Sequence, residues 1–306
     1  MNFKEVLEKY SSEDQCKAAF KKLRLKQGVA CKKCGCKEHY WQATRDQFEC
    51  KQCRFRTTLR SGTVLQHSKL PFQYWFMAMH LMTMTKKGIS ATELQFQLGH
   101  KRYEPIWKMM HKIRRGMGER DKRYQLSEEV EIDEAFFKTV NELDGQPMKR
   151  GKGSQQNTTV LVMAESLPVK KENRKKHGKQ KRSRYFKMAV VPGLSQKEIN
   201  EKVKAEVHAN SKVITDDFSS YYKLNEVIRS HKKFKAKDVD TNHVMPWVHT
   251  AIANAKRNLL GIHHRVDGKY LQNYLNEFCY KVNRRYIKEH LLERLLIAVV
   301  STCLCI

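Results

Sequence analysis

The sequence predicts an α/β protein in which a cysteine-rich module and a helical segment precede the sheet-forming region. Three observations support this fold class. Two Cys-x2-Cys pairs fall within residues 31–53, apolar residues recur at helical spacing over residues 70–118, and β-rich alternating runs begin at Val130. Helical patterns separate the later strands, which is typical of an α/β sheet flanked by helices.

The composition restricts the classes of protein to which the chain can belong. Its 306 residues include 60 Lys+Arg against 32 Asp+Glu, a formal net charge of +28. This charge indicates a polyanionic partner, nucleic acid before an anionic membrane surface. No run approaches the roughly 20 apolar residues of a membrane span, and the first residues lack the apolar core of a secretory signal. We therefore expect a cytoplasmic protein that is neither secreted nor embedded in a membrane.

Changes in residue pattern divide the chain into four stretches. Residues 1–28 are expected to form an N-terminal helical segment, and residues 29–60 hold the cysteine module. Residues 61–125 form a helical segment. Residues 126–306 contain the α/β domain together with the closing helices.

The paired cysteines predict a structural zinc site. Cys31 and Cys34 form one pair, Cys50 and Cys53 the other, and each two-residue spacer lets both thiolates face one tetrahedral ion. Four thiolates leave no open position for catalysis. Cys36 lacks a partner at this spacing and is left out. The odd total of nine cysteines argues against a disulfide framework, and the spacer between the pairs is suited to a β-hairpin.

The helical segment is a candidate DNA-binding element. We expect helices over residues 72–84, 91–98 and 104–115, with Ser90 as an N-cap paired with Glu93. The last two helices, with Gly99 in the turn, fit helix-turn-helix geometry, and the second carries several Lys and Arg residues. An ordinary pair of antiparallel helices explains the same pattern.

The α/β region combines strands and helices in a recognisable order. Strands are expected over residues 130–140, 157–166, 185–194, 211–218 and, more weakly, 232–238. Helices are expected over residues 195–206, 246–260, 268–284 and 286–301, the first with a Ser195–Glu198 capping box. The run Lys170–Arg184 is too basic to bury itself, so we interpret it as a solvated or disordered hairpin tip.

Two aspartates on different strands are candidate ligands of a divalent cation. Glu131 and Asp133 share a strand face that would normally be apolar, and a carboxylate there is costly unless it binds a cation. Asp216 ends an apolar strand, where ligand sites of open α/β sheets occur. Together they can hold Mg²⁺. Asp217 is assigned instead as the N-cap of the next helix. Taken singly, each aspartate is equally well explained as an edge or cap residue.

One helix carries two further candidates. His249 lies near the start of the helix that begins at Pro246, and Lys256 follows two turns later on the same face. An imidazole can bind a metal or position a water molecule, and Lys256 can hold a phosphate. A structural histidine is the simpler interpretation of His249 alone.

Several segments together resemble a known family. Taken in order, they are CKKC…CKQC, FRTTLRSGTVLQHSKLPFQYW, KKGISATELQFQLG, EIDEAFF, ITDDFSSYY, MPWVHTAIANAKRNLLGIHH and KYLQNYLNEFCYKVNRR. The chain resembles bacterial insertion-sequence transposases of the zinc-ribbon DDE class (ISXO-like). The resemblance implies an RNase H-like mixed sheet, with Asp133 and Asp216 as the first two acids. His249 stands at the position of the third acid, commonly Glu, and is followed by Lys256.

The resemblance also implies an activity and its partners. The chain would cleave phosphodiester bonds at element ends and join them to target DNA, using Mg²⁺ or Mn²⁺ held by Asp133, Asp216 and His249, with Lys256 holding DNA. A histidine suits Mn²⁺ better than Mg²⁺. The implied partners are double-stranded DNA, as terminal inverted repeats and target, and further copies of the chain in a homo-oligomer near the nucleoid.

Two other functions remain open. A non-catalytic zinc and helix-turn-helix regulator derived from a transposase would keep the fold and lose the activity. A basic RNA-binding protein would explain the charge. It would not explain acids paired at strand ends.

Overall fold

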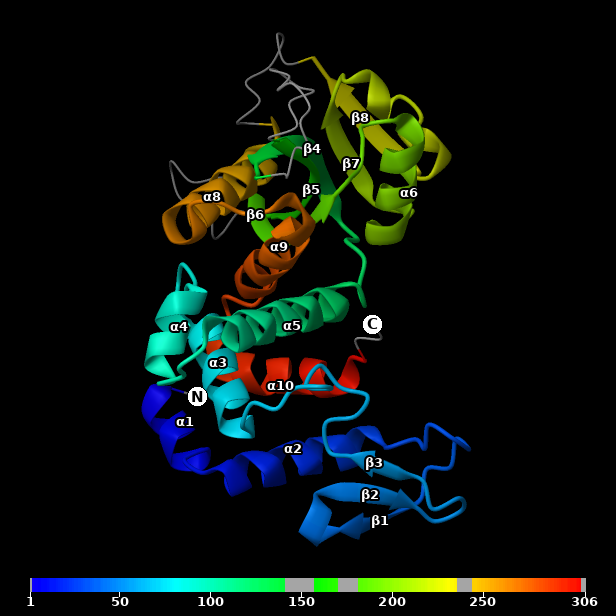
Figure 1. The fold of residues 1–306 in the computed structure, drawn as a ribbon. Coiled ribbons are helices and arrows are strands. Elements are labelled where there is room, and N and C mark those ends of the chain that lie inside the picture. Colours follow the sequence, from blue (N-terminus) through cyan, green and yellow to red (C-terminus); the bar gives the residue numbers. More distant parts are fainter. Residues whose placement is uncertain (1, 141–156, 170–180, 236–243, 304–306) are drawn as a thin grey trace, which may run out of the picture. The chain divides into compact units, whose positions relative to one another are not determined.

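The chain forms two compact units (Figure 1). The computed structural model describes residues 2–140, 157–169, 181–235 and 244–303. One unit comprises residues 1–120 with 284–306, and the other comprises residues 121–283. The first is therefore built from both ends of the chain and the second from its middle. No helix in the described part of the chain is long and apolar enough to cross a membrane.

Helices form most of the first unit. They are α1 (Phe3–Lys9), α2 (Glu13–Gln27), α3 (Phe72–Met84), α4 (Ala91–Gln97), α5 (Tyr103–Asp121), the short η5 (Lys288–His290) and α10 (Leu291–Ser301). Ser12 and Gln15 form a capping box at the start of α2. Glu13 serves α3 instead: its two carboxylate oxygens accept hydrogen bonds from the N–H groups of Phe72 and Gln73 at 2.9 Å each. This carboxylate supplies the cap that the residue preceding α3 does not provide.

The predicted helices of this unit are present, and some of their ends differ: α10 begins at Leu291 rather than near residue 286. Helix α3 has the predicted bounds, and the Ser90 hydroxyl caps α4 by accepting from the Glu93 N–H at 3.0 Å. Helix α5 continues past the predicted end at Arg115 to Asp121. The reason is that its apolar face continues, because Met117 is as fully buried as Ile113 one turn earlier.

The last helix belongs to the first unit, which corrects the predicted domain division. Residues 284–306 were assigned with the α/β domain, but α10 packs against α2 and α3. The Val64 N–H donates to the carbonyl of Val299 at 3.1 Å. Helix α10 is apolar on most of its surface, so its apolar residues are buried among the N-terminal helices.

The cysteine module forms a small antiparallel sheet. Its strands are β1 (His39–Gln42), β2 (Gln47–Cys50) and β3 (Arg56–Thr58), in the order β1-β2-β3, with the short η1 (Ala43–Arg45) between the first two. Strands β1 and β2 are the predicted hairpin. Phe48 is buried on β2 and packs against Trp41 with the ring centroids 4.9 Å apart. One aromatic pair is a very small core for a module of this size.

The second unit contains a five-stranded mixed sheet. Its strands are β4 (Glu129–Lys138), β5 (Asn157–Pro168), β6 (Lys181–Val190), β7 (Lys212–Asp216) and β8 (Ser230–Phe234), in the order β6-β5-β4-β7-β8. Strands β4, β5 and β6 pair antiparallel, whereas β7 is parallel to β4 and β8 is parallel to β7. This is the topology of the RNase H-like fold, so the predicted fold class is confirmed.

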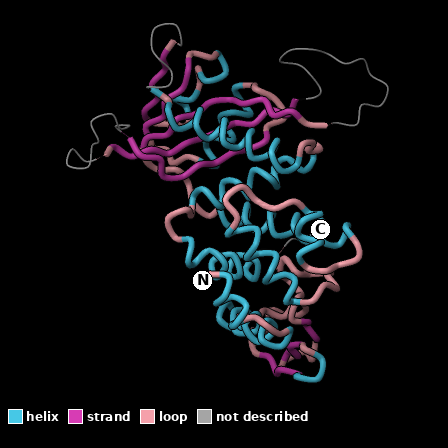
Figure 2. Tube along the Cα trace, turned by 90° about the vertical axis from the view of Figure 1, so that its left-hand side faces the viewer, coloured by secondary structure: helices cyan, strands magenta, loops and turns pink. Residues whose placement is uncertain are grey.

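Helices cover both faces of this sheet, which Figure 2 shows in magenta. They are α6 (Gln196–Glu206), with the predicted Ser195–Glu198 capping box, α8 (Pro246–His263) and α9 (Gly268–Asn283). Ile132 packs in the core shared with α6, whereas Ala135 packs in the core shared with α8 and α9. Alternation along β4 places residues 131 and 133 on one face, as predicted, and the structure shows that this face is the one covered by α8 and α9.

The segment after β7 differs from its prediction, and the basic run Lys170–Arg184 is described only in part. The predicted helix after β7 is a pair of short 3-10 turns, η3 (Ser219–Tyr221) and η4 (Leu224–Glu226). Of the basic run Lys170–Arg184, residues 170–180 lie outside the described residues, and the rest belongs to β6.

Candidate active site and zinc ribbon

The four predicted zinc ligands converge in the first unit. The sulfur atoms of Cys31, Cys34, Cys50 and Cys53 all lie within 4.8 Å of one another. The sulfurs of Cys31 and Cys53 are 3.5 Å apart, as are those of Cys34 and Cys50. The donor set and its spacing fit one tetrahedral Zn²⁺. Cys36 is not part of the set, because its sulfur contacts the backbone of Glu38.

The backbone explains why each Cys-x2-Cys pair can face one centre. The N–H of Gly35 donates to the carbonyl of Cys31 at 2.9 Å, and the N–H of Arg54 donates to that of Cys50 at 3.0 Å. Gly35 and Arg54 occupy matching places in the two turns, and both have positive φ, 74° and 60°. A hydrogen bond from the Cys53 N–H lowers the pKa of the Cys50 thiol to about 6, which favours the thiolate that binds metal.

The two predicted aspartates meet in the second unit. Asp133 lies on β4 and Asp216 ends β7. The ladder between these parallel strands has its last pair at Glu131 and Ile214, two residues before the acids. The strands therefore stop pairing where the carboxylates lie. The chain also changes direction across the sheet between β4 and β7, and such a switch point is where open α/β sheets bind ligands.

A third carboxylate lies with these two. Single ligand oxygens of Asp133, Glu134 and Asp216 all lie within 4.8 Å of one another. The Tyr221 hydroxyl donates to Glu134 Oε2 at 2.8 Å, and burial raises the pKa of Glu134. Glu134 was missed because strand alternation places it on the face opposite Asp133. The end of the ladder to β7 was the missing information, and no residue pattern encodes it.

His249 contacts the acid cluster from α8. Its Nε2 lies 3.4 Å from Asp133 Oδ2, and this interaction raises the pKa of the imidazole. His249 is not in the set of mutually close ligand atoms that Asp133, Glu134 and Asp216 form. The structure therefore brings the predicted histidine to one of the two aspartates. Its predicted role as a shared metal ligand stays a prediction.

Lys256 lies two turns along α8 from His249. Its side chain is exposed, and Nζ is 5.7 Å from the ring centroid of Phe137 on β4. The residue is thus beside the sheet on the helix that carries His249, and it is open to a ligand from solvent. Its phosphate-holding role stays a prediction.

Asp217 does not have the predicted capping role. The carboxylate that accepts from the following backbone belongs to Asp216, whose Oδ1 lies 3.2 Å from the Phe218 N–H. Helical turn η3 has no side-chain cap. This hydrogen bond engages one carboxylate oxygen of Asp216 and limits rotation of its side chain.

Glu131 has a role that sequence reasoning did not assign. It is fully buried, and its Oε2 accepts hydrogen bonds from the N–H groups of Trp247 and Val248 at 2.7 and 2.8 Å. These are the first free N–H groups of α8, which begins at Pro246 and has no side-chain cap from Met245. Burial raises the pKa of Glu131 to about 7. The sequence indicates only that Glu131 shares a strand face with Asp133, and the structure adds its capping of α8.

Replacing Glu131 with Ala should loosen the start of α8. The Trp247 and Val248 amides would lose their acceptor, and loss of a helix cap costs about 1–2 kcal/mol. We expect faster hydrogen exchange at these two amides and a lower denaturation midpoint. Glu131→Gln keeps an acceptor oxygen and is the matched control. Equal protection of both amides in the Ala variant would contradict the capping role.

Comparison with known proteins identifies the family. Residues 125–283 match the model of the ISXO2-like transposase domain, and residues 11–56 match that of the transposase zinc-ribbon domain. The chain belongs to the ISXO2-like transposases. Asp133, Asp216 and His249 all lie inside the matched transposase domain, and the four cysteines of the predicted zinc site all lie inside the matched zinc-ribbon domain. The predicted family and the predicted function of a DNA transposase are confirmed.

Solved structures of other transposases resemble this transposase only distantly. A Mos1 transposase paired-end complex with the left transposon end shares 13% identity, with a TM-score of 0.30 and coverage of 78% of this chain and 82% of that chain. A Mos1 mariner paired-end complex with Mn shares 15% identity at the same coverage, with a TM-score of 0.29. No curated protein matches the chain. The family assignment rests on the matched domains.

Proposed function

We propose that this transposase cuts and joins DNA strands at a divalent-metal site built on Asp133 and Asp216. The supporting observation is the convergence of the two carboxylates, from strands that stop pairing beside them, inside the transposase domain. Carboxylate oxygens are the ligands that Mg²⁺ prefers, and His249 beside Asp133 favours Mn²⁺ as an alternative. When bound, such ions activate a nucleophilic oxygen and stabilise the leaving oxygen.

The residues of the chain have distinct tasks in this proposal. Asp133 and Asp216 hold the cation site at the open end of the β4–β7 pair. His249 either binds the same cation or orients Asp133, with which it is in contact. Lys256, exposed on the same helix, holds a phosphate of the terminal DNA. In the cleavage step water attacks the phosphodiester at the element end, and the 3′-oxygen of the element leaves as a hydroxyl. In the joining step that 3′-hydroxyl attacks a phosphodiester of the target, whose own 3′-oxygen leaves, so no covalent enzyme intermediate forms.

The partners follow from the same proposal. Double-stranded DNA binds as terminal inverted repeat and as target, and the zinc ribbon with helices α3–α5 supplies end recognition. The zinc is structural, since the four thiolates fill its coordination sphere. Bringing two element ends together requires more than one copy of the chain. The decisive experiment is divalent-dependent cleavage and transfer of a duplex carrying the element end. End binding with no cleavage under any divalent ion would indicate a non-catalytic regulator.

His249 should set metal affinity and preference. We expect His249→Ala to weaken Mn²⁺ binding about tenfold or more, because a ligand or a partner of a ligand is lost. His249→Glu should raise the ratio of Mg²⁺-supported to Mn²⁺-supported cleavage, since carboxylate oxygen suits Mg²⁺ better than imidazole nitrogen does. Mn²⁺ titration by electron paramagnetic resonance measures the first effect, and cleavage rates in each metal measure the second. Unchanged affinity and an unchanged ratio would remove His249 from the site.

A further inference from the structure

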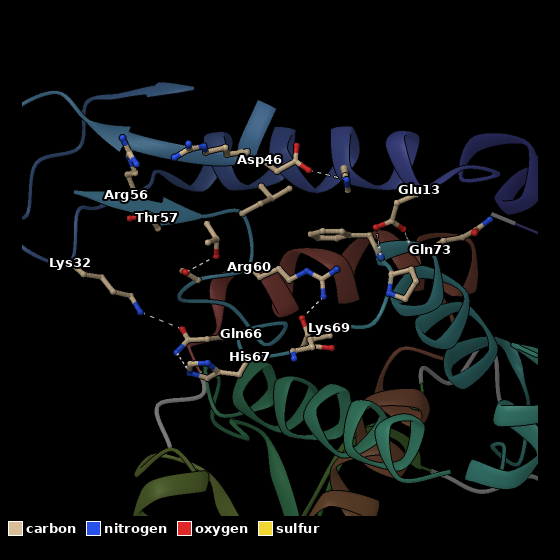
Figure 3. Close-up of a pocket in the computed structure, with 18 of the residues that line it drawn as sticks. Glu13, Lys32, Asp46, Arg56, Thr57, Arg60, Gln66, His67, Lys69 and Gln73 are labelled. Carbon is tan, nitrogen blue, oxygen red and sulfur yellow. Dashed lines mark hydrogen bonds and ion pairs between the residues drawn. The ribbon is translucent and has the colours of Figure 1, made fainter. Parts of the chain in front are cut away.

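A basic groove lies within the first unit, apart from the candidate active site. It has a volume of about 1130 Å³ and runs between strand β3, the segment 59–69 and the facing ends of α2 and α3 (Figure 3). All its lining residues come from residues 13–73. The groove therefore belongs entirely to the first unit, which contains the zinc ribbon.

Positive charge dominates the lining. The cationic residues are Lys17, Lys32, Arg45, Arg56, Arg60 and Lys69. Against these six stand two acids, Glu13 and Asp46, which leaves an excess of four positive charges. The lining side chains that can donate hydrogen bonds are mostly Lys, Arg, Ser and Thr, the types that contact phosphate and sugar in protein–DNA interfaces.

The two acids are already engaged by the protein. Both oxygens of Glu13 accept from the first N–H groups of α3, and Asp46 pairs with Lys17 at 2.8 Å. In the described part of the chain, neither carboxylate forms an ion pair with the four lining cations that are themselves unpaired, although the charge of Glu13 still acts on Arg60. Arg45 and Lys69 are exposed, and among the described residues neither forms an ion pair. Lys32 reaches only the neutral amide oxygen of Gln66, at 3.3 Å.

Arg60 is held in place by neutral contacts, and the nearby charge of Glu13 offsets only part of the effect of burial on its pKa. Its guanidinium carbon lies 4.3 Å from the ring centroid of Phe72, and Nη1 donates to the carbonyl of Ser68 at 2.5 Å. Burial lowers the pKa of Arg60, which reflects the cost of keeping this charge away from water. A bound phosphate would offset that cost and meet a guanidinium that is already oriented.

We propose that this groove binds the sugar-phosphate backbone of double-stranded DNA. The proposal rests on the proposed function and extends it by naming the surface of the zinc-ribbon unit that holds the backbone. Charge complementarity supports it. Two of the six cations are paired, Lys17 with Asp46 and Arg56 with Glu49 at 3.4 Å. The other four line the same concave surface and form no ion pair among the described residues. Binding through phosphates fixes the position of the duplex and leaves sequence recognition to other residues.

The test compares two double variants that lose the same charge. Arg45→Ala/Lys69→Ala removes two exposed cations of the groove that form no ion pair in the part of the chain that the structure describes. Lys22→Ala/Lys26→Ala removes two exposed lysines of α2 that do not line the groove. Full-length protein loaded with zinc is titrated with a labelled element-end duplex over a salt series by fluorescence anisotropy. Equal zinc content and equal circular dichroism confirm that both variants are folded.

The groove variant should bind duplex at least about tenfold more weakly at physiological salt. Its slope of log affinity against log salt should fall by about 1.8, because each phosphate contact contributes about 0.9. The control variant Lys22→Ala/Lys26→Ala should keep an affinity and a salt slope close to those of the wild type. Equal affinities and equal salt slopes in the two double variants would overturn the proposal that the groove binds DNA, while leaving the proposed function intact. Wild-type protein that binds no duplex even at low salt would instead overturn the proposed function.

Discussion

Asp133→Asn and Asp216→Asn are each expected to abolish strand cleavage and strand transfer. Asparagine keeps the size of the side chain and removes the charge that holds a divalent cation. Loss of several kcal/mol of transition-state stabilisation lowers the rate by at least about a thousandfold. The measurement follows a labelled element-end duplex through cleavage and joining in Mg²⁺ and in Mn²⁺. End binding should persist, because the DNA-binding residues proposed above lie in the other unit.

Asp217→Asn provides the matched control for this experiment. Asp217 is the immediate neighbour of Asp216 but is not in the set of converging ligand atoms. We expect near wild-type cleavage from this variant. Strand transfer that persists in Asp133→Asn, or that disappears equally in Asp217→Asn, would show that the assignment of the two acids is wrong.

Removal of zinc is expected to unfold the ribbon. The sheet β1-β2-β3 is short, and its aromatic packing is one buried residue, Phe48, against the partly buried Trp41, so its own core is too small to hold it. Structural zinc supplies on the order of 10 kcal/mol of folding free energy in small cysteine modules. Cys50→Ser, or a strong chelator, should abolish amide protection in these strands and weaken end binding. The sheet β6-β5-β4-β7-β8 should keep its protection, since it belongs to the other unit.

Cys36→Ser tests whether Cys36 is a zinc ligand. Its sulfur contacts the backbone of Glu38 and is outside the four-cysteine set. We expect one zinc ion per chain in this variant, as in the wild type, measured by elemental analysis after dialysis. Loss of zinc equal to that in Cys50→Ser would make Cys36 a ligand and contradict the predicted set.

Local patterns predicted the elements well because their causes are local. Helix α3 has the predicted bounds, and the Ser195–Glu198 capping box begins α6 as expected. Both depend on residues a few positions apart. The matching Cys-x2-Cys pairs likewise predicted the convergence of four sulfurs. Each pair is brought together by its own short turn, so only one further contact, between the two turns, is needed to complete the site.

The features that were missed depend on tertiary structure. Glu131 caps a helix more than a hundred residues later in the chain, and Glu134 reaches the acid cluster only because the β4–β7 ladder ends before it. Neither contact has a periodic signature. His249 is favoured as a site residue only through the family resemblance, and the structure brings its Nε2 to 3.4 Å from Asp133 Oδ2. Assignment of the last helix failed for the same reason, because an apolar helix does not encode which surface will cover it.

The position of α10 has a consequence for synthesis of the chain. Because α10 covers α2 and α3, the N-terminal unit cannot close its core until residues 291–301 have left the ribosome. Residues 121–283 are complete earlier and can fold first. Translation that stops just after residue 283 would release a finished RNase H-like unit attached to helices with an uncovered apolar surface. The first unit can therefore complete its core only after residues 291–301 have been synthesised, so premature termination before α10 is expected to yield a chain that aggregates or is degraded.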